Sequence, residues 1–125
     1  MTLLSFVGTL LIGCQKPTSG DVVGTWVNPD GAALTLEEDG GFSVRRLPIE
    51  VFIGPDQTGQ PIDGSGRWRL EYENPYWTVK LSFEQISGQP SRRGIPVLVS
   101  GSGTSVYLYQ WKGEEGGARY KLIRK

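Results

Sequence analysis

Side chains that commonly carry catalysis or bind metals are scarce in this sequence of 125 residues. It contains no histidine and only one cysteine, Cys14. Histidine and cysteine supply the bases, nucleophiles and ligands of serine and cysteine hydrolases and of most zinc sites. The sequence therefore predicts a noncatalytic protein with no cofactor, no metal site and no internal disulfide.

An excess of charge of one sign is also missing. The chain has 13 Lys and Arg residues against 13 Asp and Glu residues, and the two signs are interspersed. Such a balance provides no basic field for nucleic acid, so we expect no nucleic-acid partner. The acidic clusters at 37–39 and 114–115 lie beside glycines and lack the spacing of a calcium loop, which is typical of solvated turns.

Long hydrophobic runs are absent as well. The apolar stretch at residues 2–13 has no charge, but it is shorter than the roughly 20 residues that a membrane-spanning helix needs. It has the length of the hydrophobic region of a secretion signal. It ends in Leu11-Ile12-Gly13-Cys14, which resembles the lipobox of bacterial lipoprotein precursors.

That resemblance implies a location for the protein. Residues 1–13 would be removed, Cys14 would receive acyl chains, and residues 14–21 would form the acylated cysteine and a flexible tether before a domain at 22–125. The membrane would be a partner through the acyl chains on Cys14, and the domain would lie outside the cytoplasm at the cell membrane or the outer membrane. The alternative is that the first residues form a buried element of the domain.

Short apolar segments separated by glycine and proline make up the rest of the chain. Two of them alternate strictly between apolar and polar residues, 67–73 and 76–84, and the Asn74-Pro75 link between them predicts a hairpin. Asp39-Gly40 predicts a second hairpin. The remaining predicted strands are 22–27, 32–37, 42–46, 95–100, 104–111 and 118–124.

No segment shows sustained helical spacing, so the fold class is all-β. About eight short antiparallel strands predict a small up-and-down barrel or a sandwich. The connections 48–66 and 87–94 are the long ones, and residues 50–53 of the first are a candidate additional short strand.

A second resemblance concerns the start of the first predicted strand. Gly24-Thr25-Trp26 is similar to the Gly-x-Trp signature that opens lipocalins and related small barrels. The resemblance implies that Trp26 packs across one end of the barrel and is covered by an arginine from the last strand, with Arg124 or Arg119 in that role through a cation–π contact.

An eight-stranded barrel either fills its interior with side chains or holds one small ligand. Both alternatives stay open here. Bulky residues on predicted inward faces can fill the core completely, and in a pocket the same rings would be the walls. The candidate wall residues are Trp68, Tyr72, Trp77 and Phe83.

The segment 104–111 is unusual because both of its faces are apolar. Val106 and Leu108 lie on one face, whereas Tyr107, Tyr109 and Trp111 lie on the other. A barrel strand needs only one such face, so the second is either covered by a long loop such as 48–66 or presented to a partner. Arg92 and Arg93 in a neighbouring connection are candidates to frame a contact for an anionic group.

Two functions follow as hypotheses. In the first, the barrel is a noncatalytic binding module for a small apolar or amphipathic molecule, which requires a cavity. In the second, a barrel with a filled core docks an envelope protein through the face of Tyr107, Tyr109 and Trp111. Rings buried under loops would count against the second hypothesis.

Overall fold

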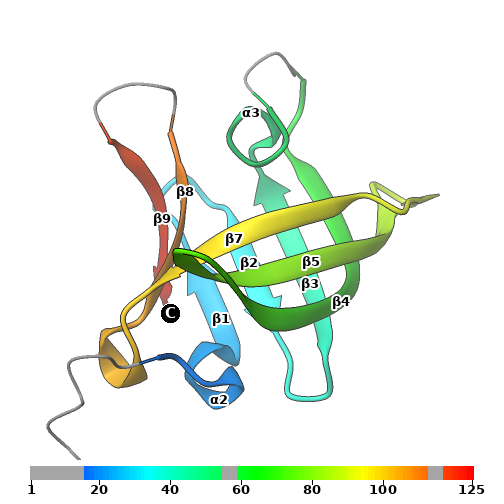
Figure 1. Cartoon of the computed structure of the whole chain (residues 1–125). Coiled ribbons are helices and arrows are strands. Elements are labelled where there is room, and N and C mark those ends of the chain that lie inside the picture. Colours follow the sequence, from blue (N-terminus) through cyan, green and yellow to red (C-terminus); the bar gives the residue numbers. More distant parts are fainter. Residues whose placement is uncertain (1–15, 55–58, 113–116) are drawn as a thin grey trace, which may run out of the picture.

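The computed structural model describes residues 16–54, 59–112 and 117–125, most of which lie in strands (Figure 1). The strands are β1 (Gly24–Val27), β2 (Ala33–Leu36), β3 (Gly41–Leu47), β4 (Ile62–Glu73), β5 (Tyr76–Ile86), β6 (Gln89–Pro90), β7 (Gly94–Ser100), β8 (Tyr107–Trp111) and β9 (Arg119–Arg124). The helical segments are α2 (Ser19–Val22), α3 (Ile49–Phe52) and the 3-10 turn η2 (Gly103–Ser105).

Antiparallel pairing runs around a closed ring. The sheet order is β4-β3-β2-β1-β9-β8-β7-β5-β6, and the additional pairing of β4 with β5 closes it. The two-residue β6 pairs only with β5 and stands outside the ring of eight. Because β9 pairs with β1, with Trp26 opposite Arg124, the first and last strands are neighbours in the ring. The predicted all-β, small antiparallel barrel of about eight strands is confirmed.

The interior of the barrel is filled with aliphatic and aromatic side chains. They come from inward-facing positions of β1, β2, β3, β5, β7, β8 and β9, which alternate along a strand. Each is at most 4% exposed, which places this set in one continuous core. The set comprises Trp26, Leu34, Leu36, Phe42, Val44, Val79, Leu81, Phe83, Val97, Leu108 and Leu122.

Trp26 closes the barrel at the α2 end. Its ring is fully buried and its indole N–H donates to the carbonyl of Val22 in α2 at 2.8 Å. The guanidinium of Arg124 lies 4.3 Å from the ring centroid and donates to the carbonyls of Asp21 (2.6 Å) and Val23 (3.1 Å). Arg124 therefore joins the last strand, the first strand and α2 at one point.

Gly24 permits this close approach. Its φ is +135°, and a Cβ atom there would lie 3.1 Å from a guanidinium nitrogen of Arg124. A larger residue would therefore be strained in its backbone and crowded against the arginine. Gly24, Trp26 and Arg124 form one structural unit.

The ordered fold begins before the predicted domain boundary at residue 22. Pro17 is already buried. Thr18 and Asp21 form a reciprocal capping box on α2, in which Thr18 N–H donates to the Asp21 carboxylate at 2.9 Å. Hydrogen bonds to backbone N–H groups of Thr18 and Gly103 hold the pKa of Asp21 below its usual value. Residues 17–21, which the sequence assigned to the tether, are therefore part of the ordered end of the barrel.

The connection 48–66 also differs from the prediction. Residues 49–52 form helix α3, and β4 starts at Ile62 rather than at residue 67. Residues 50–53 contain only three apolar residues after Glu50, too few to show a period that separates helix from strand, so the expected short strand is a helix instead. α3 lies over the end of the barrel opposite α2 (Figure 1). There the ring of Phe52 packs edge-on against Tyr120 at 5.6 Å.

Tyr120 carries the buried polar contact of this end. Its hydroxyl donates to a carboxylate oxygen of Asp30 at 2.6 Å. Burial, followed by that hydrogen bond, raises the pKa of Tyr120 well above that of a free tyrosine. The folded protein therefore holds the hydroxyl proton more tightly than the unfolded chain does.

This linkage predicts a loss of stability in alkali. The contribution of Tyr120 is complete below about pH 10, the pKa of an unfolded tyrosine, and decreases as the pH rises above that value. The free energy of unfolding, measured with urea, should be lower at about pH 11 than at about pH 9 for the wild type. It should also be lower for Tyr72→Phe, which alters an exposed tyrosine. The decrease should be smaller in Tyr120→Phe, and an equal decrease in all three proteins would contradict the assignment.

Candidate binding surfaces

The four predicted wall residues lie in two different environments. Phe83 is in the core, where its ring packs edge-on against Phe42 with 5.0 Å between centroids. Trp68 and Trp77 are half-buried, and Tyr72 is 52% exposed. Phe83 is thus separated from the other three, and packed core side chains stand where a pocket inside the barrel would lie.

Trp68, Tyr72 and Trp77 lie on an extension of the β4–β5 hairpin, here called the arm (residues 68–77). The pairing of β3 with β4 ends at Gly41 opposite Arg67, whereas β4 continues to pair with β5 as far as Glu73 opposite Tyr76. The inward face of the arm places Tyr72 opposite Trp77, with 5.1 Å between ring centroids. The arm exists because β4 has twelve residues and β3 only seven.

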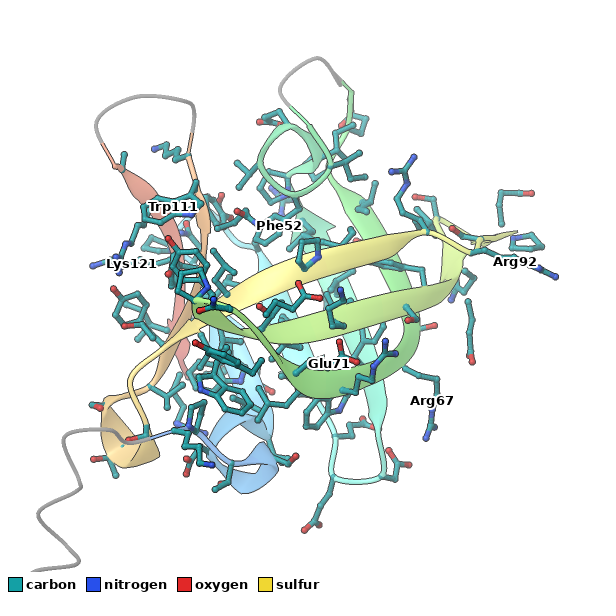
Figure 2. All side chains as sticks on the ribbon, in the orientation of Figure 1. Phe52, Arg67, Glu71, Arg92, Trp111 and Lys121 are labelled. Carbon is teal, nitrogen blue, oxygen red and sulfur yellow. The ribbon has the colours of Figure 1, made fainter. Side chains whose placement is uncertain are left out.

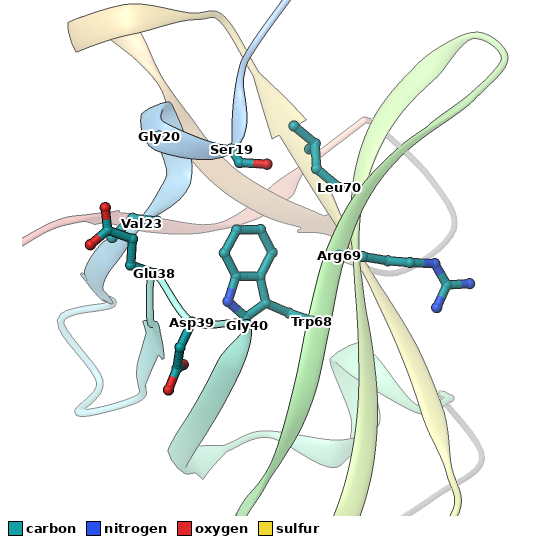
Figure 3. Close-up of a pocket in the computed structure, with 9 residues that line it drawn as sticks. All are labelled: Ser19, Gly20, Val23, Glu38, Asp39, Gly40, Trp68, Arg69 and Leu70. Carbon is teal, nitrogen blue, oxygen red and sulfur yellow. The ribbon is translucent and has the colours of Figure 1, made fainter.

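A shallow hollow of about 490 Å³ separates the base of the arm from α2 and from the β2–β3 turn (Figure 3). Its apolar lining is provided by Trp68, Leu70 and Val23, and its polar lining by Glu38, Asp39 and Arg69 together with Ser19, Gly20 and Gly40. Trp68 is fixed there, because its indole N–H donates to the carbonyl of Glu37 at 2.9 Å. The hollow is open and amphipathic.

The outer face of β8 holds a second group, here called the aromatic strip (Tyr107, Tyr109 and Trp111). Successive ring centroids are 5.8 Å and 5.4 Å apart. Arg119, opposite Trp111 on β9, lies 4.4 Å from the Tyr109 ring and 5.1 Å from the Trp111 ring. Lys121 lies 4.9 Å from the Tyr107 ring.

Two of the three rings of the strip stay accessible. Tyr109 is only 3% exposed, whereas Tyr107 and Trp111 are half-buried and Arg119 and Lys121 are exposed. The Tyr109 ring lies between the two neighbouring rings and under the guanidinium of Arg119. The strip is thus an aromatic surface edged by two cations (Figure 2).

The charges of the strip act on its hydroxyl groups. Burial alone would raise the pKa of Tyr107, but hydrogen bonds with Ser100 and Arg119 and the charges of Arg119 and Lys121 hold it below its ordinary value. Burial raises the pKa of Tyr109 in spite of Arg119. The pKa values of the two hydroxyl groups are therefore shifted in opposite directions.

Two arginine predictions need correction. Arg119, one of two candidates to cover Trp26, lies over the aromatic strip instead, and Arg124 covers Trp26. Arg92 lies at the far end of the β5–β7 connection, across the molecule from Trp111 and Lys121 (Figure 2). It lines a separate open depression of about 540 Å³ with Phe83, Glu84, Pro90 and Ser91. Arg92 is thus not part of the strip.

The sequence did not single out Lys121 or Leu70, and it indicated Arg119 only as one of two candidates to cover Trp26. Arg119 and Lys121 alternate with the buried Tyr120 and Leu122, so their outward direction could be predicted. Their positions opposite Trp111 and Tyr109 depend on the register between β8 and β9, which no local pattern specifies. Leu70 is one of the apolar residues that alternate with polar ones along β4. Because β3 pairs with β4 only as far as Arg67, Leu70 lies past the end of β3, and this depends on the length of β3.

The predicted acylation site, Cys14, and the predicted signal segment lie outside the described residues. Within residues 16–54, 59–112 and 117–125, no group of three or more acidic or thiol side chains is placed to hold a metal ion. The helices described are all too short to cross a lipid bilayer.

Comparisons with protein-family models, with curated proteins and with solved structures find no match for this chain.

Proposed function

We propose that this protein is a noncatalytic interaction module of the bacterial cell envelope, held outside the cytoplasm by acyl chains on Cys14. The resemblance of residues 11–14 to a lipobox supports the anchor. A small closed barrel is a fold compatible with binding. The proposed partner is an acidic segment of an envelope protein.

The observation that carries the interaction proposal is the contrast between the interior and the outer surface. The core is packed, and Trp26 and Phe52 lie at its two ends. The aromatic strip, in contrast, places Tyr, Trp and Arg on the outside, the three residue types most enriched among the energetically dominant contacts of protein interfaces. Arg119 and Lys121 add a positive edge that an acidic partner complements.

Crosslinking in cells tests the docking surface. A photoreactive residue at Ile123, an exposed position of β9, should crosslink to a discrete partner, whereas one at Ser43 should not. Ser43 is on β3, which is four strands from β8 in both directions, through β2-β1-β9 and through β4-β5-β7. Arg119→Glu should reduce the yield about tenfold, and Arg45→Glu on β3 should leave it unchanged.

Two results would contradict this function. The first is equal crosslinking from Ile123 and Ser43, and the second is a yield that Arg119→Glu does not alter. The anchor is tested separately by the intact mass of protein recovered from the membrane fraction. A mature chain that starts at Cys14 with added acyl mass supports the anchor, and an unmodified chain overturns it.

The open hollow beside Trp68 favours a second candidate, the binding of a small amphipathic ligand. Its volume lies within the range of small-molecule sites, and it combines apolar and charged walls. Such a ligand would lie against Trp68 and Leu70 rather than inside the barrel. A change in the emission of Trp68 on addition of envelope lipids or glycans, lost in Trp68→Phe, would support this candidate.

A further inference from the structure

The chain enters the fold at the α2 end of the barrel, three residues after Cys14. Pro17 is buried and Thr18 caps α2 through the reciprocal hydrogen bonds with Asp21. Three fully extended residues span about 10 Å at most. If acyl chains are attached to Cys14, as the proposed function states, this part of the barrel surface must therefore lie close to the bilayer.

The arm lies next to this entry point. Ser19 and Gly20 of α2 line the same hollow as Trp68 and Leu70 at the base of the arm. Figure 3 shows the chain leaving Ser19 on the side toward which the β4–β5 hairpin extends. The end of the arm is thus among the surfaces that a short tether brings to the membrane.

Exposed aromatic residues gather at the end of the arm. Three large apolar or aromatic side chains are exposed among the described residues, and two of them, Tyr72 (52%) and Tyr76 (40%), are in the arm. The half-buried Trp77 lies beside Tyr72. Tyr and Trp are the residues enriched where membrane headgroups meet the acyl chains, because their rings are apolar and their polar atoms remain hydrated.

The acidic residues of the arm are paired with bases. Arg69 forms an ion pair with Glu71, and Lys80 forms one with Glu73 at 2.7 Å. These four side chains therefore carry no net charge, so the arm is not repelled by anionic lipids. Lys16, exposed at the entry point, adds a positive charge on the same side.

We propose that the arm rests in the headgroup region of the bilayer, with Tyr72, Tyr76 and Trp77 in contact with lipid. This proposal depends on the anchor at Cys14. It specifies more than the anchor does, because it fixes which surface of the barrel faces the membrane. The aromatic strip borders the arm, since Tyr76 and Tyr109 interact electrostatically, but its Tyr109 ring is already covered by protein.

Quenching of tryptophan emission by brominated lipids tests the arm. Cys14 is the only cysteine, so the full chain can be coupled through it to a maleimide lipid in vesicles of phosphatidylethanolamine and phosphatidylglycerol brominated near the headgroup. Quenching should be similar in the wild type and in Trp111→Phe, and at least halved in Trp77→Phe. The variant Tyr72→Ser/Tyr76→Ser keeps Trp77 and should also reduce quenching.

The proposal is overturned if Trp77→Phe is quenched as much as the wild type. It is also overturned if quenching is lost only in Trp111→Phe, which would place the aromatic strip against lipid and contradict protein docking as well. Circular dichroism spectra that match the wild type show that each variant is folded. Because the lipid is coupled chemically, the quenching test is valid whether or not the cell acylates Cys14. Absence of the natural anchor would be detected only by the intact mass of protein from the membrane fraction.

Discussion

Replacing Gly66 with alanine should destabilise the barrel by about 3 kcal/mol or more, or prevent folding. A Cβ atom at Gly66 would lie 2.0 Å from the carbonyl oxygen of Ser82 and 2.9 Å from the Cα of Phe83. Both atoms belong to the backbone, so no side-chain rotation relieves the overlap. Gly66 also lies at the register shift between β4 and β5, where the barrel wall bends sharply.

Gly94→Ala is the matched control for this substitution. Gly94 is also a strand glycine beside β5, but its added Cβ would meet only the Leu81 carbonyl oxygen at 3.8 Å, an ordinary contact. Urea unfolding should show a change within about 0.5 kcal/mol for Gly94→Ala. A similar small change for Gly66→Ala would mean that the two strands are farther apart than the structure shows.

The second large effect is expected for Trp26→Ala, which should lower the free energy of unfolding by about 3–5 kcal/mol. The substitution removes a fully buried ring from the end of the core. It also leaves the Val22 carbonyl without its donor and Arg124 without the ring beneath its guanidinium. These losses affect α2, β1 and β9 together.

Trp26→Phe separates the ring from its N–H group. It keeps an aromatic ring at the barrel end but removes the hydrogen bond to Val22 and part of the buried ring volume, so a loss of about 1–3 kcal/mol is expected. Chemical denaturation of both variants measures the difference. A loss of less than about 1 kcal/mol for Trp26→Ala would show that the ring does not hold the end of the barrel closed.

The alternation of apolar and polar residues predicted the strands correctly wherever a strand has one buried face with side chains along it. In β5 the predicted inward residues Val79, Leu81 and Phe83 are all buried, and Trp77 continues the same face. The predicted antiparallel hairpin of 67–73 with 76–84 forms. One buried face is enough to determine such a strand, because a shift by one residue would expose every apolar side chain.

The first five residues of β4 show no alternation of apolar and polar side chains. Gly64 and Gly66 are buried on the inward face but have no side chain, so the sequence there is typical of a turn. The ring of Phe83 occupies the space beside Gly64, where an added Cβ atom would lie 2.8 Å from it, and the backbone of β5 occupies the space beside Gly66. That compensation comes from residues far apart in the sequence and is not visible locally.

The candidate surfaces were predicted in part. Two apolar faces on one strand correctly indicated that Tyr107, Tyr109 and Trp111 lie outside the barrel wall. The cations over these rings come from β9, and the arm results from a difference in length between β3 and β4. Such features depend on how strands are matched across the sheet, which alternation within one strand does not report.

The pairing of the first strand with the last also has a consequence for biosynthesis. While the chain is being made, β1 and β8 have no neighbour on one side until residues 119–124 emerge, and Trp26 has no arginine above it. The ring of strands is completed by β9, and next to it the backbone N–H of Lys125 donates to the carbonyl of Thr25. The barrel therefore cannot close before β9 is available, and β1 lacks a neighbour on one side until then.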